Sequence, residues 1–147
     1  MAILDVAGEQ GFTAGARIME RCAELRSISA GPHAYTRLYL TPEHRAAATR
    51  IGGWMAEAGA SARMDAAGNM IGRIEGANPT APALVLGSHF DTVHEAGSYD
   101  GVLGVVVAIE VAAGLNAEGR PLPKGNRLKG VGLNEAADAA FGAQVCG

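Results

Sequence analysis

Aromatic residues and cysteines are scarce in this 147-residue sequence, and no long apolar run is present. Aromatic side chains make up 5% of the residues, although 48% of all residues are hydrophobic. The core of a folded chain must therefore come mainly from small aliphatic residues, which suits helices packed closely on a sheet. The two cysteines, Cys22 and Cys146, lie far apart in the sequence. The sequence does not exclude a disulfide between them, but we predict free thiols in a reducing compartment.

The sequence also has no excess of basic residues. Twelve Lys and Arg face fifteen Asp and Glu, giving a net charge of −3. No basic field is available to attract nucleic acid or an anionic membrane surface. No apolar run approaches the length needed to span a bilayer, and the N-terminus has no secretory signal pattern. We therefore expect a cytoplasmic protein with no nucleic-acid partner and no membrane partner.

The arrangement of apolar residues predicts an α/β fold with mixed strand directions. Thr41 and Pro42 form a helix start, in which a hydroxyl N-cap precedes proline at the first helical position. His44, in the first turn of this helix, is predicted to be structural. We expect helices over 16–28, 41–58 and 102–115, a hairpin of 62–65 and 70–75, a buried strand over 83–86, a further strand over 128–133, and a helix beginning within 136–145.

Two short motifs follow the strand predicted over 83–86. His89 and Asp91 are two residues apart, so an extended chain places both side chains on one face. A carboxylate behind an imidazole can fix its tautomer and make it a better metal ligand. Asp100 lies in a glycine-containing loop that opens an apolar helix, and could point back toward His89. On spacing alone, an ordinary surface pair of His89 and Asp91 is favoured, because H-x-D is a common triplet; the order of strand, H-x-D, loop and D-G-x-x-G helix start favours a site.

The order of these parts resembles one enzyme family. GSHFDTV (87–93) and YDGVLGVV (99–106) are similar to the metal-binding core of allantoate amidohydrolases and N-carbamoyl-L-amino-acid hydrolases, which are di-metal aminoacylase and carboxypeptidase-like hydrolases. TRLYLTPEH (36–44) and DAAGN (65–69) also resemble that family. The resemblance implies a mixed sheet with helices on both faces. It further implies that 1–147 form the N-terminal part of a di-zinc-peptidase-like catalytic domain, without the lid domain through which the family forms homodimers.

The resemblance also implies a site with two divalent ions, zinc or manganese. His89 matches a terminal ligand on one ion, and Asp100 matches the carboxylate that bridges the two ions. Asp91 matches a carboxylate that stands behind His89 and does not touch metal. His94 matches no family role, and we interpret it as a loop residue. The implied reaction is the hydrolysis of a non-peptide C–N bond in a small ureido substrate, with allantoate preferred over N-carbamoyl amino acids.

The sequence departs from the family pattern near its end. The family carries a carboxylate pair on the strand after the second motif, which supplies the general base and a ligand of the second ion. Ala136 and Ala137 occupy those positions here, and neither can accept a proton or bind metal. Glu135 is one residue early, and a one-residue slip in a strand turns a side chain to the other face. We expect an incomplete ligand set and no useful turnover by this chain alone; the alternative is a non-catalytic metal-binding remnant of the fold.

Overall fold

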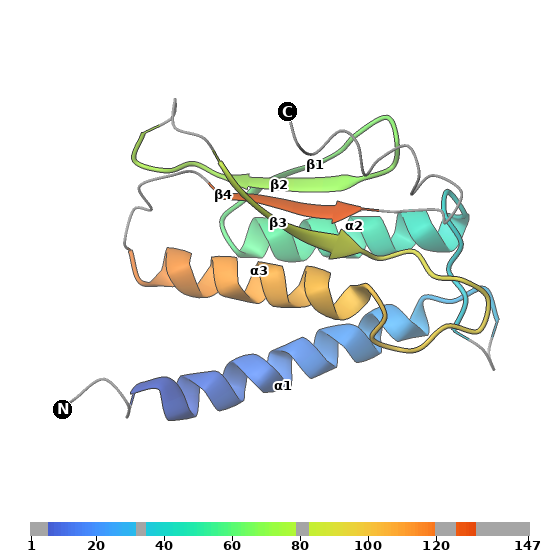
Figure 1. The fold of residues 1–147 in the computed structure, drawn as a ribbon, viewed down its shortest axis with the longest axis horizontal. Coiled ribbons are helices and arrows are strands. Elements are labelled where there is room, and N and C mark those ends of the chain that lie inside the picture. Colours follow the sequence, from blue (N-terminus) through green and yellow to red (C-terminus); the bar gives the residue numbers. More distant parts are fainter. Residues whose placement is uncertain (1–5, 32–34, 79–82, 120–125, 132–147) are drawn as a thin grey trace.

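A computed structural model describes residues 6–31, 35–78, 83–119 and 126–131 as three helices and four strands (Figure 1). The elements in chain order are α1 (Val6–Ser27), α2 (Pro42–Glu57), β1 (Ser61–Met64), β2 (Met70–Ile74), β3 (Leu84–His89), α3 (Val102–Ala117) and β4 (Asn126–Val131). Each of these elements overlaps one predicted from the sequence. The helix expected within 136–145 lies outside the described residues.

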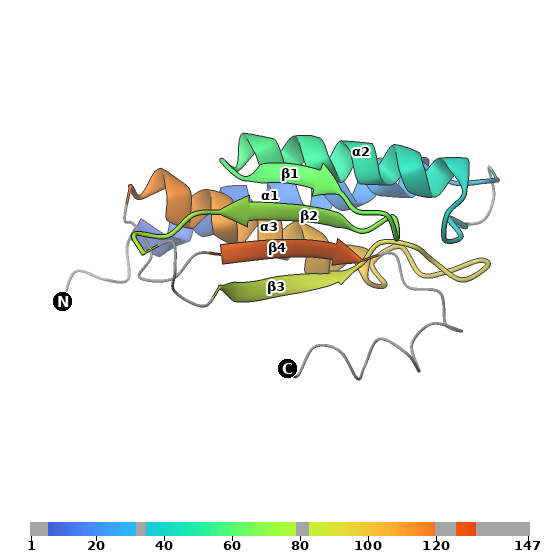
Figure 2. The same ribbon diagram turned by 90° about the horizontal axis from the view of Figure 1, so that it is seen from above.

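The four strands form one mixed sheet in the order β1-β2-β4-β3 (Figure 2). β1 pairs with β2 and β2 with β4 in antiparallel fashion, whereas β3 and β4 are parallel. Parallel neighbours require a crossover connection, and α3 supplies it between β3 and β4. The predicted α/β class with mixed strand directions is thus confirmed.

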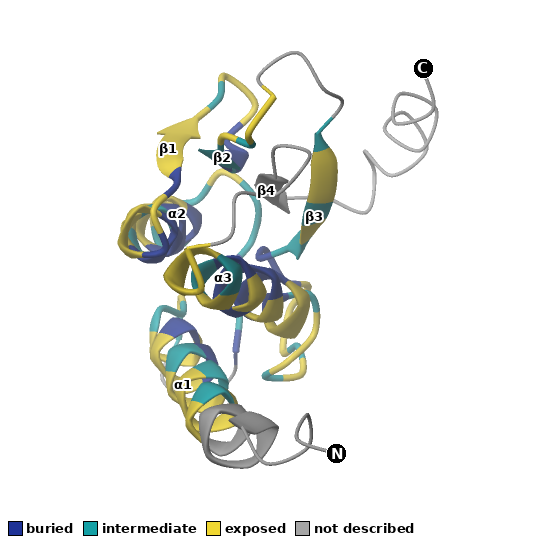
Figure 3. Cartoon of the chain, turned by 90° about the vertical axis from the view of Figure 1, so that its left-hand side faces the viewer, coloured by how far each residue is buried: buried dark blue, intermediate teal, exposed yellow. Residues whose placement is uncertain are grey.

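The described helices all lie on one side of this sheet. α2 packs against β1 and β2, α3 packs against β3, and α1 contacts α3 from the side away from the sheet (Figures 1 and 3). The family arrangement has helices on both faces; within the described residues, helices cover one face only. None of the helices in this part of the chain is both long and apolar enough to cross a membrane.

The second helix forms as its sequence predicts. Thr41 has an extended backbone conformation and its hydroxyl accepts a hydrogen bond from the His44 backbone N–H, with Pro42 at the start of the helix. Ile51, Trp54 and Met55 are buried at helical spacing, as expected. The first helix begins earlier than predicted, at Val6 rather than residue 16. Its glycines at 8, 11 and 15 weaken helix propensity and hid this extension.

The hairpin turn also follows from its residues. The Asp65 carboxylate accepts the backbone N–H groups of Ala67 (3.0 Å) and Asn69 (2.9 Å), and Gly68 has a positive φ of 79°. A carboxylate that bonds the backbone two residues on is a common way to make a tight turn. Tyr39 closes the turn from outside by donating its hydroxyl to the Ala67 carbonyl.

The core fills the space between the sheet and its helices. It is built mainly from aliphatic side chains around Tyr35, Trp54 and Phe90, in keeping with the scarcity of aromatics. Its largest fully buried apolar members are Trp54, Phe90, Leu25, Ile51, Met55, Ile109, Val102, Val105 and Val106.

The strand predicted over 83–86 is confirmed, but its predicted burial was wrong. β3 begins at Leu84 and continues to His89, and Leu84 and Val85 remain 54% and 50% exposed. β3 stands at an edge of the described sheet, so it has one strand neighbour. Within the described residues, all helices lie on one face of the sheet, so no helix covers the other face of this edge strand. An apolar run predicts a strand, but it does not show what covers it.

Candidate metal centre

The predicted site residues gather where β3 ends and α3 begins. His89 is the last residue of β3, and Asp100 comes just before Gly101, the N-cap of α3. The carboxyl ends of strands in open α/β sheets are a usual place for binding sites. The fold therefore brings the two motifs, eleven residues apart, to the same end of one strand.

The side chains of His89 and Asp100 face each other. His89 Nε2 lies 3.8 Å from Asp100 Oδ1, and the side chains are 31% and 63% exposed. On the other side of the ring, His89 Nδ1 lies 3.1 Å from the backbone carbonyl of Asp91 and 3.5 Å from its carboxylate Oδ1. A proton on Nδ1 would be donated to Asp91 and would leave the Nε2 electron pair directed at Asp100.

Asp91 lies behind His89, as the sequence predicted, but its closest contact to the ring is different. The backbone carbonyl approaches the imidazole more closely than the carboxylate does. The interaction with the Asp91 carboxylate raises the pKa of His89 above its ordinary value, against the opposing effect of partial burial. Asp91 itself is 3% exposed. It can therefore act on the imidazole without being available to a ligand from solvent.

The types and spacing of these groups fit a divalent ion. Imidazole nitrogen and carboxylate oxygen bind zinc at roughly 2.0–2.2 Å, so two donors 3.8 Å apart can share one ion. The number of ligands is smaller than a catalytic site needs, since catalytic zinc usually has three protein ligands. Across the described ranges, no group of three or more His, Cys, Asp or Glu could hold a metal.

Gly101 permits the close approach of His89 to the start of α3. Its φ is +67°, a conformation that residues with a Cβ rarely adopt. A Cβ at this position would overlap the imidazole, because its three nearest neighbours would all be ring atoms of His89. The glycine in the DG pair is thus needed both for the backbone turn and for the space that the ring occupies.

His44 is buried next to the site but not in it. Its ring stacks on Phe90 with centroids 4.5 Å apart and meets Tyr39 edge-on at 5.3 Å. Burial lowers its pKa, and Nε2 has no hydrogen-bond partner within the described part of the chain. These contacts agree with the structural role predicted for it.

The remaining predicted residues are placed differently. His94 is exposed in the loop between β3 and α3. Glu135, Ala136 and Ala137 lie outside the described residues. Arg37 was not predicted as part of the site; it is fully buried and bonds to Phe90 and Thr92, which flank Asp91. A lone arginine in an otherwise alternating stretch gives no signal of burial, because arginine is almost always exposed unless it is paired.

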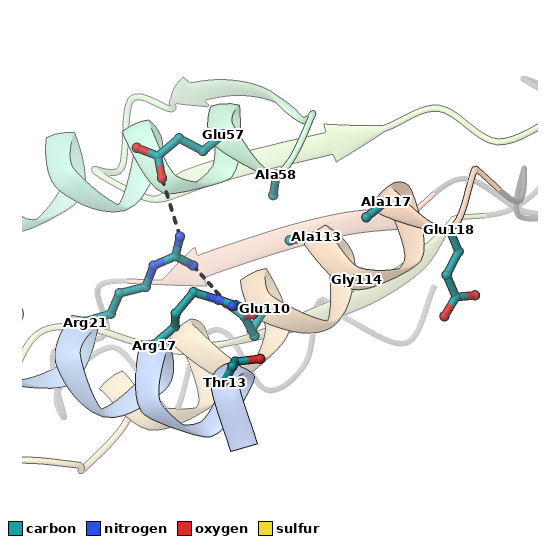
Figure 4. Close-up of a pocket in the computed structure, with 10 residues that line it drawn as sticks. All are labelled: Thr13, Arg17, Arg21, Glu57, Ala58, Glu110, Ala113, Gly114, Ala117 and Glu118. Carbon is teal, nitrogen blue, oxygen red and sulfur yellow. Dashed lines mark hydrogen bonds and ion pairs between the residues drawn. The ribbon is translucent and has the colours of Figure 1, made fainter. Parts of the chain in front are cut away.

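A separate pocket of about 640 Å³ lies at the other end of α3, between α1, α2 and α3 (Figure 4). Glu110 projects from α3 toward α1, where Arg17 and Arg21 both pair with its carboxylate. Arg21 also reaches Glu57 of α2 at 3.4 Å. The pocket is lined by Thr13, Arg17, Arg21, Glu57, Ala58, Glu110, Ala113, Gly114, Ala117 and Glu118. It contains none of the predicted site residues.

Comparison with known proteins agrees with the motifs. The family model described as Peptidase family M28 matches residues 69–133. An N-carbamoyl-L-amino acid amidohydrolase of Geobacillus stearothermophilus is 42% identical over 106 residues, which cover 71% of this chain and 26% of that protein. An allantoate deiminase of Arabidopsis thaliana is 41% identical over 100 residues, covering 68% of this chain and 19% of that protein.

A solved structure gives the same result for the fold. A hydantoinase/carbamoylase family amidase from Burkholderia ambifaria matches with a TM-score of 0.74 and 35% identity, over 79% of this chain and 29% of that one. The fold and motifs therefore define a segment related to amidohydrolases that act on non-peptide C–N bonds. Among its relatives are N-carbamoyl-L-amino acid amidohydrolases and allantoate deiminases, which confirms the resemblance predicted from the sequence. The chain spans between 18% and 26% of the lengths of the curated relatives it matches.

Proposed function

We propose that this chain supplies the first metal ligands of a metal-dependent amidohydrolase that cleaves a C–N bond of a ureido substrate. The observation that carries the proposal is the approach of His89 Nε2 to Asp100 Oδ1 at 3.8 Å, at the end of a strand where the matching motifs meet. The relatives named above act, by their names, on N-carbamoyl amino acids or on allantoate.

The residues have separable tasks in this proposal. His89 offers the Nε2 electron pair to one ion, while Asp91 holds the proton on Nδ1. Asp100 has two carboxylate oxygens and is 63% exposed, so it can serve two ions at once. A divalent ion bound there would polarise the substrate carbonyl and lower the pKa of a water molecule.

In this proposal Glu135 is the group that accepts a proton from the water molecule. Ala136 and Ala137 stand at the positions where the family has carboxylates. We expect the 147-residue chain alone to show no useful turnover and no tight stoichiometric binding of two ions. Calorimetric titration with zinc and manganese tests the binding, and two tightly bound ions per chain would contradict it.

We propose allantoate as the substrate, with N-carbamoyl-L-amino acids as the alternative. The two are distinguished by ammonia release from each compound, measured on a full-length protein that contains this segment. The enzyme is first stripped with a chelator and then supplied with zinc or manganese.

The same assay tests the site. Removing a metal ligand should cost several kcal/mol of transition-state stabilisation, which is at least roughly 10³-fold in rate. We therefore expect His89→Ala and Asp100→Ala to abolish metal-restored turnover and His94→Ala, which alters an exposed loop histidine, to retain it. Full turnover by His89→Ala would refute the proposed centre.

A further inference from the structure

Arg37 is completely buried and its side chain binds backbone carbonyls from two distant parts of the chain. Nε donates to the Phe90 carbonyl at 2.8 Å. Nη1 donates to the carbonyls of Leu25 (2.6 Å) and Ile28 (3.0 Å) at the end of α1. One guanidinium therefore ties the end of the first helix to the residue between His89 and Asp91.

The backbone of Arg37 holds the same segment at a second point. Its N–H donates to the Thr92 hydroxyl at 2.7 Å, and its carbonyl accepts the Thr92 N–H at 2.9 Å. Arg37 thus contacts Phe90 on one side of Asp91 and Thr92 on the other. These bonds fix the backbone at Asp91, and the Asp91 carbonyl is the atom nearest to His89 Nδ1.

The charge of Arg37 acts in the same direction. In the bonds above, the guanidinium donates to neutral carbonyl oxygens. Its Nη2 donates to the Tyr35 hydroxyl at 2.5 Å, which is also neutral. A buried cation is costly unless an opposite charge lies near. Burial lowers the pKa of Arg37, and the interactions with Tyr35 and then the negative charge of Asp91 oppose that shift. The carboxylate of Asp91 thus favours the ionised form of the buried guanidinium.

We infer that Arg37 is a positioning residue of the candidate metal centre: by fixing Asp91, it holds the His89 ring with its proton on Nδ1 and Nε2 turned toward Asp100. The inference rests on the proposed metal centre for its functional meaning. Its structural content, the orientation and tautomer of one imidazole, can be measured without any metal.

The first experiment reads the tautomer of His89 in this chain. Long-range ¹H–¹⁵N spectra are recorded at a pH well above the pKa of the imidazole, for the parent chain, Arg37→Met and Arg37→Lys. We expect the parent to hold the proton on Nδ1 and Arg37→Met to lose that preference. Arg37→Lys should restore it in part, because lysine keeps the charge but lacks the planar fork of donors.

Two further variants separate positioning from general destabilisation. Glu110→Gln breaks the ion pairs of the buried Glu110 carboxylate in the middle of α3, and should leave the His89 tautomer unchanged. Thr92→Val removes only the hydroxyl that accepts the Arg37 N–H, and should shift the tautomer in the same direction as Arg37→Met but less. It also keeps the inference testable if Arg37→Met does not fold.

The functional consequence is measured in a full-length protein that contains this segment. Changes to the partners of metal-ligating histidines typically weaken metal affinity by about 10–100-fold, and we expect this for Arg37→Met. A folded Arg37→Met with the parent tautomer would overturn the inference, as would an equal change in Glu110→Gln. If His89→Ala kept its activity, the proposed function would fail, while the tautomer result would still decide the role of Arg37.

Discussion

The start and the middle of α3 differ in how buried charge is paired. In the middle of the helix, Glu110 is 7% exposed and its carboxylate is matched by Arg17 and Arg21. At the site end, the buried guanidinium of Arg37 is bound through neutral oxygens, and the carboxylate of Asp100 is left largely exposed. The charges of the first region satisfy one another, whereas those of the second leave an imidazole nitrogen and a carboxylate directed at a common point.

This contrast separates two kinds of polar cluster. A carboxylate held by two guanidinium groups is already supplied with donors, so it stabilises the packing of α1 on α3 and has little capacity left for a ligand. His89 Nε2 and Asp100 can bind a cation because their fixed contacts involve other atoms or leave lone pairs open. Charged side chains mark both regions, but only the second directs two kinds of metal donor, an imidazole nitrogen and a carboxylate oxygen, at a common point.

The largest effect that would break this contrast is expected from Gly101→Ala. The left-handed backbone should cost about 1–2 kcal/mol, and the added methyl group would displace the His89 ring. We expect the metal affinity of a full-length protein to fall by about 10–100-fold, as for other changes that misplace a ligating histidine. Metal affinity is measured by titration, and the free energy of unfolding of the same variant by chemical denaturation.

Gly53→Ala and Gly114→Ala are matched controls for that change. Both glycines lie inside helices, and an added Cβ would meet nothing within 4 Å. Alanine should stabilise each helix by roughly 0.5–1 kcal/mol and leave metal binding unchanged. Normal metal binding by Gly101→Ala would show that His89 does not need this space.

A smaller effect is expected from Glu110→Gln, in the middle of α3. The amide keeps the shape but loses the charge that both arginines contact. Arg17 is 52% exposed and remains solvated, so we expect a loss of about 1–3 kcal/mol of stability rather than the larger cost of a fully buried pair. Urea unfolding measures this as a lower midpoint with an unchanged slope.

The control for Glu110→Gln is Glu57→Gln. Glu57 is 59% exposed and contacts Arg21 at 3.4 Å, so its removal should cost less than about 1 kcal/mol. Equal losses from the two variants would mean that burial of Glu110 adds nothing, and that the start and the middle of α3 differ less than their contacts suggest.

The smallest effect is a pH dependence from His44. Burial lowers its pKa in the fold, while Asp91 opposes and Arg37 reinforces that shift. Below the unfolded pKa of about 6.5, the unfolded chain binds a proton that the folded chain does not. Stability should therefore fall as pH drops from that value toward the folded pKa, by at most about 1.4 kcal/mol per pH unit.

Replacing His44 with leucine should remove this acid-dependent loss, and chemical unfolding at a series of pH values measures it. The comparison with the parent is needed because His89 has the opposite sign: its raised pKa adds stability below about 6.5 that is lost as pH rises through its folded pKa. His94→Gln, at an exposed position, serves as control. A parallel pH profile for His44→Leu and the parent would refute the assignment.

Local signals were enough to predict most of the fold. The Thr41–Pro42 start, the Asp65 turn and the apolar run of α3 each specify their own element, because the residues that cause the structure are adjacent in sequence. The exposure of Leu84 and Val85 could not be predicted in that way. It depends on the sheet order, which places β3 at an edge, and strand order is a property of the whole chain.

The candidate site shows the same difference between local and non-local causes. The motifs containing His89, Asp91 and Asp100 are short, and their approach follows from a strand that leads into a loop and helix. Arg37 was missed because its role comes from contacts with residues 12 positions before it and more than 50 after it. The preference of His89 Nδ1 for the backbone carbonyl of Asp91 was also missed, since a side-chain pattern contains no information about carbonyl directions.

The position of β4 in the sheet has a consequence for how the chain is made. β4 lies between β2 and β3, yet among the described strands it comes last in the sequence (Figure 2). During synthesis, β2 and β3 cannot join into one sheet until residues 126–131 have left the ribosome. Such late, non-local pairing slows folding and leaves strand edges open to other chains. Nascent chains that end before Asn126 should therefore carry two unjoined sheet fragments and be more prone to aggregation than chains only slightly longer.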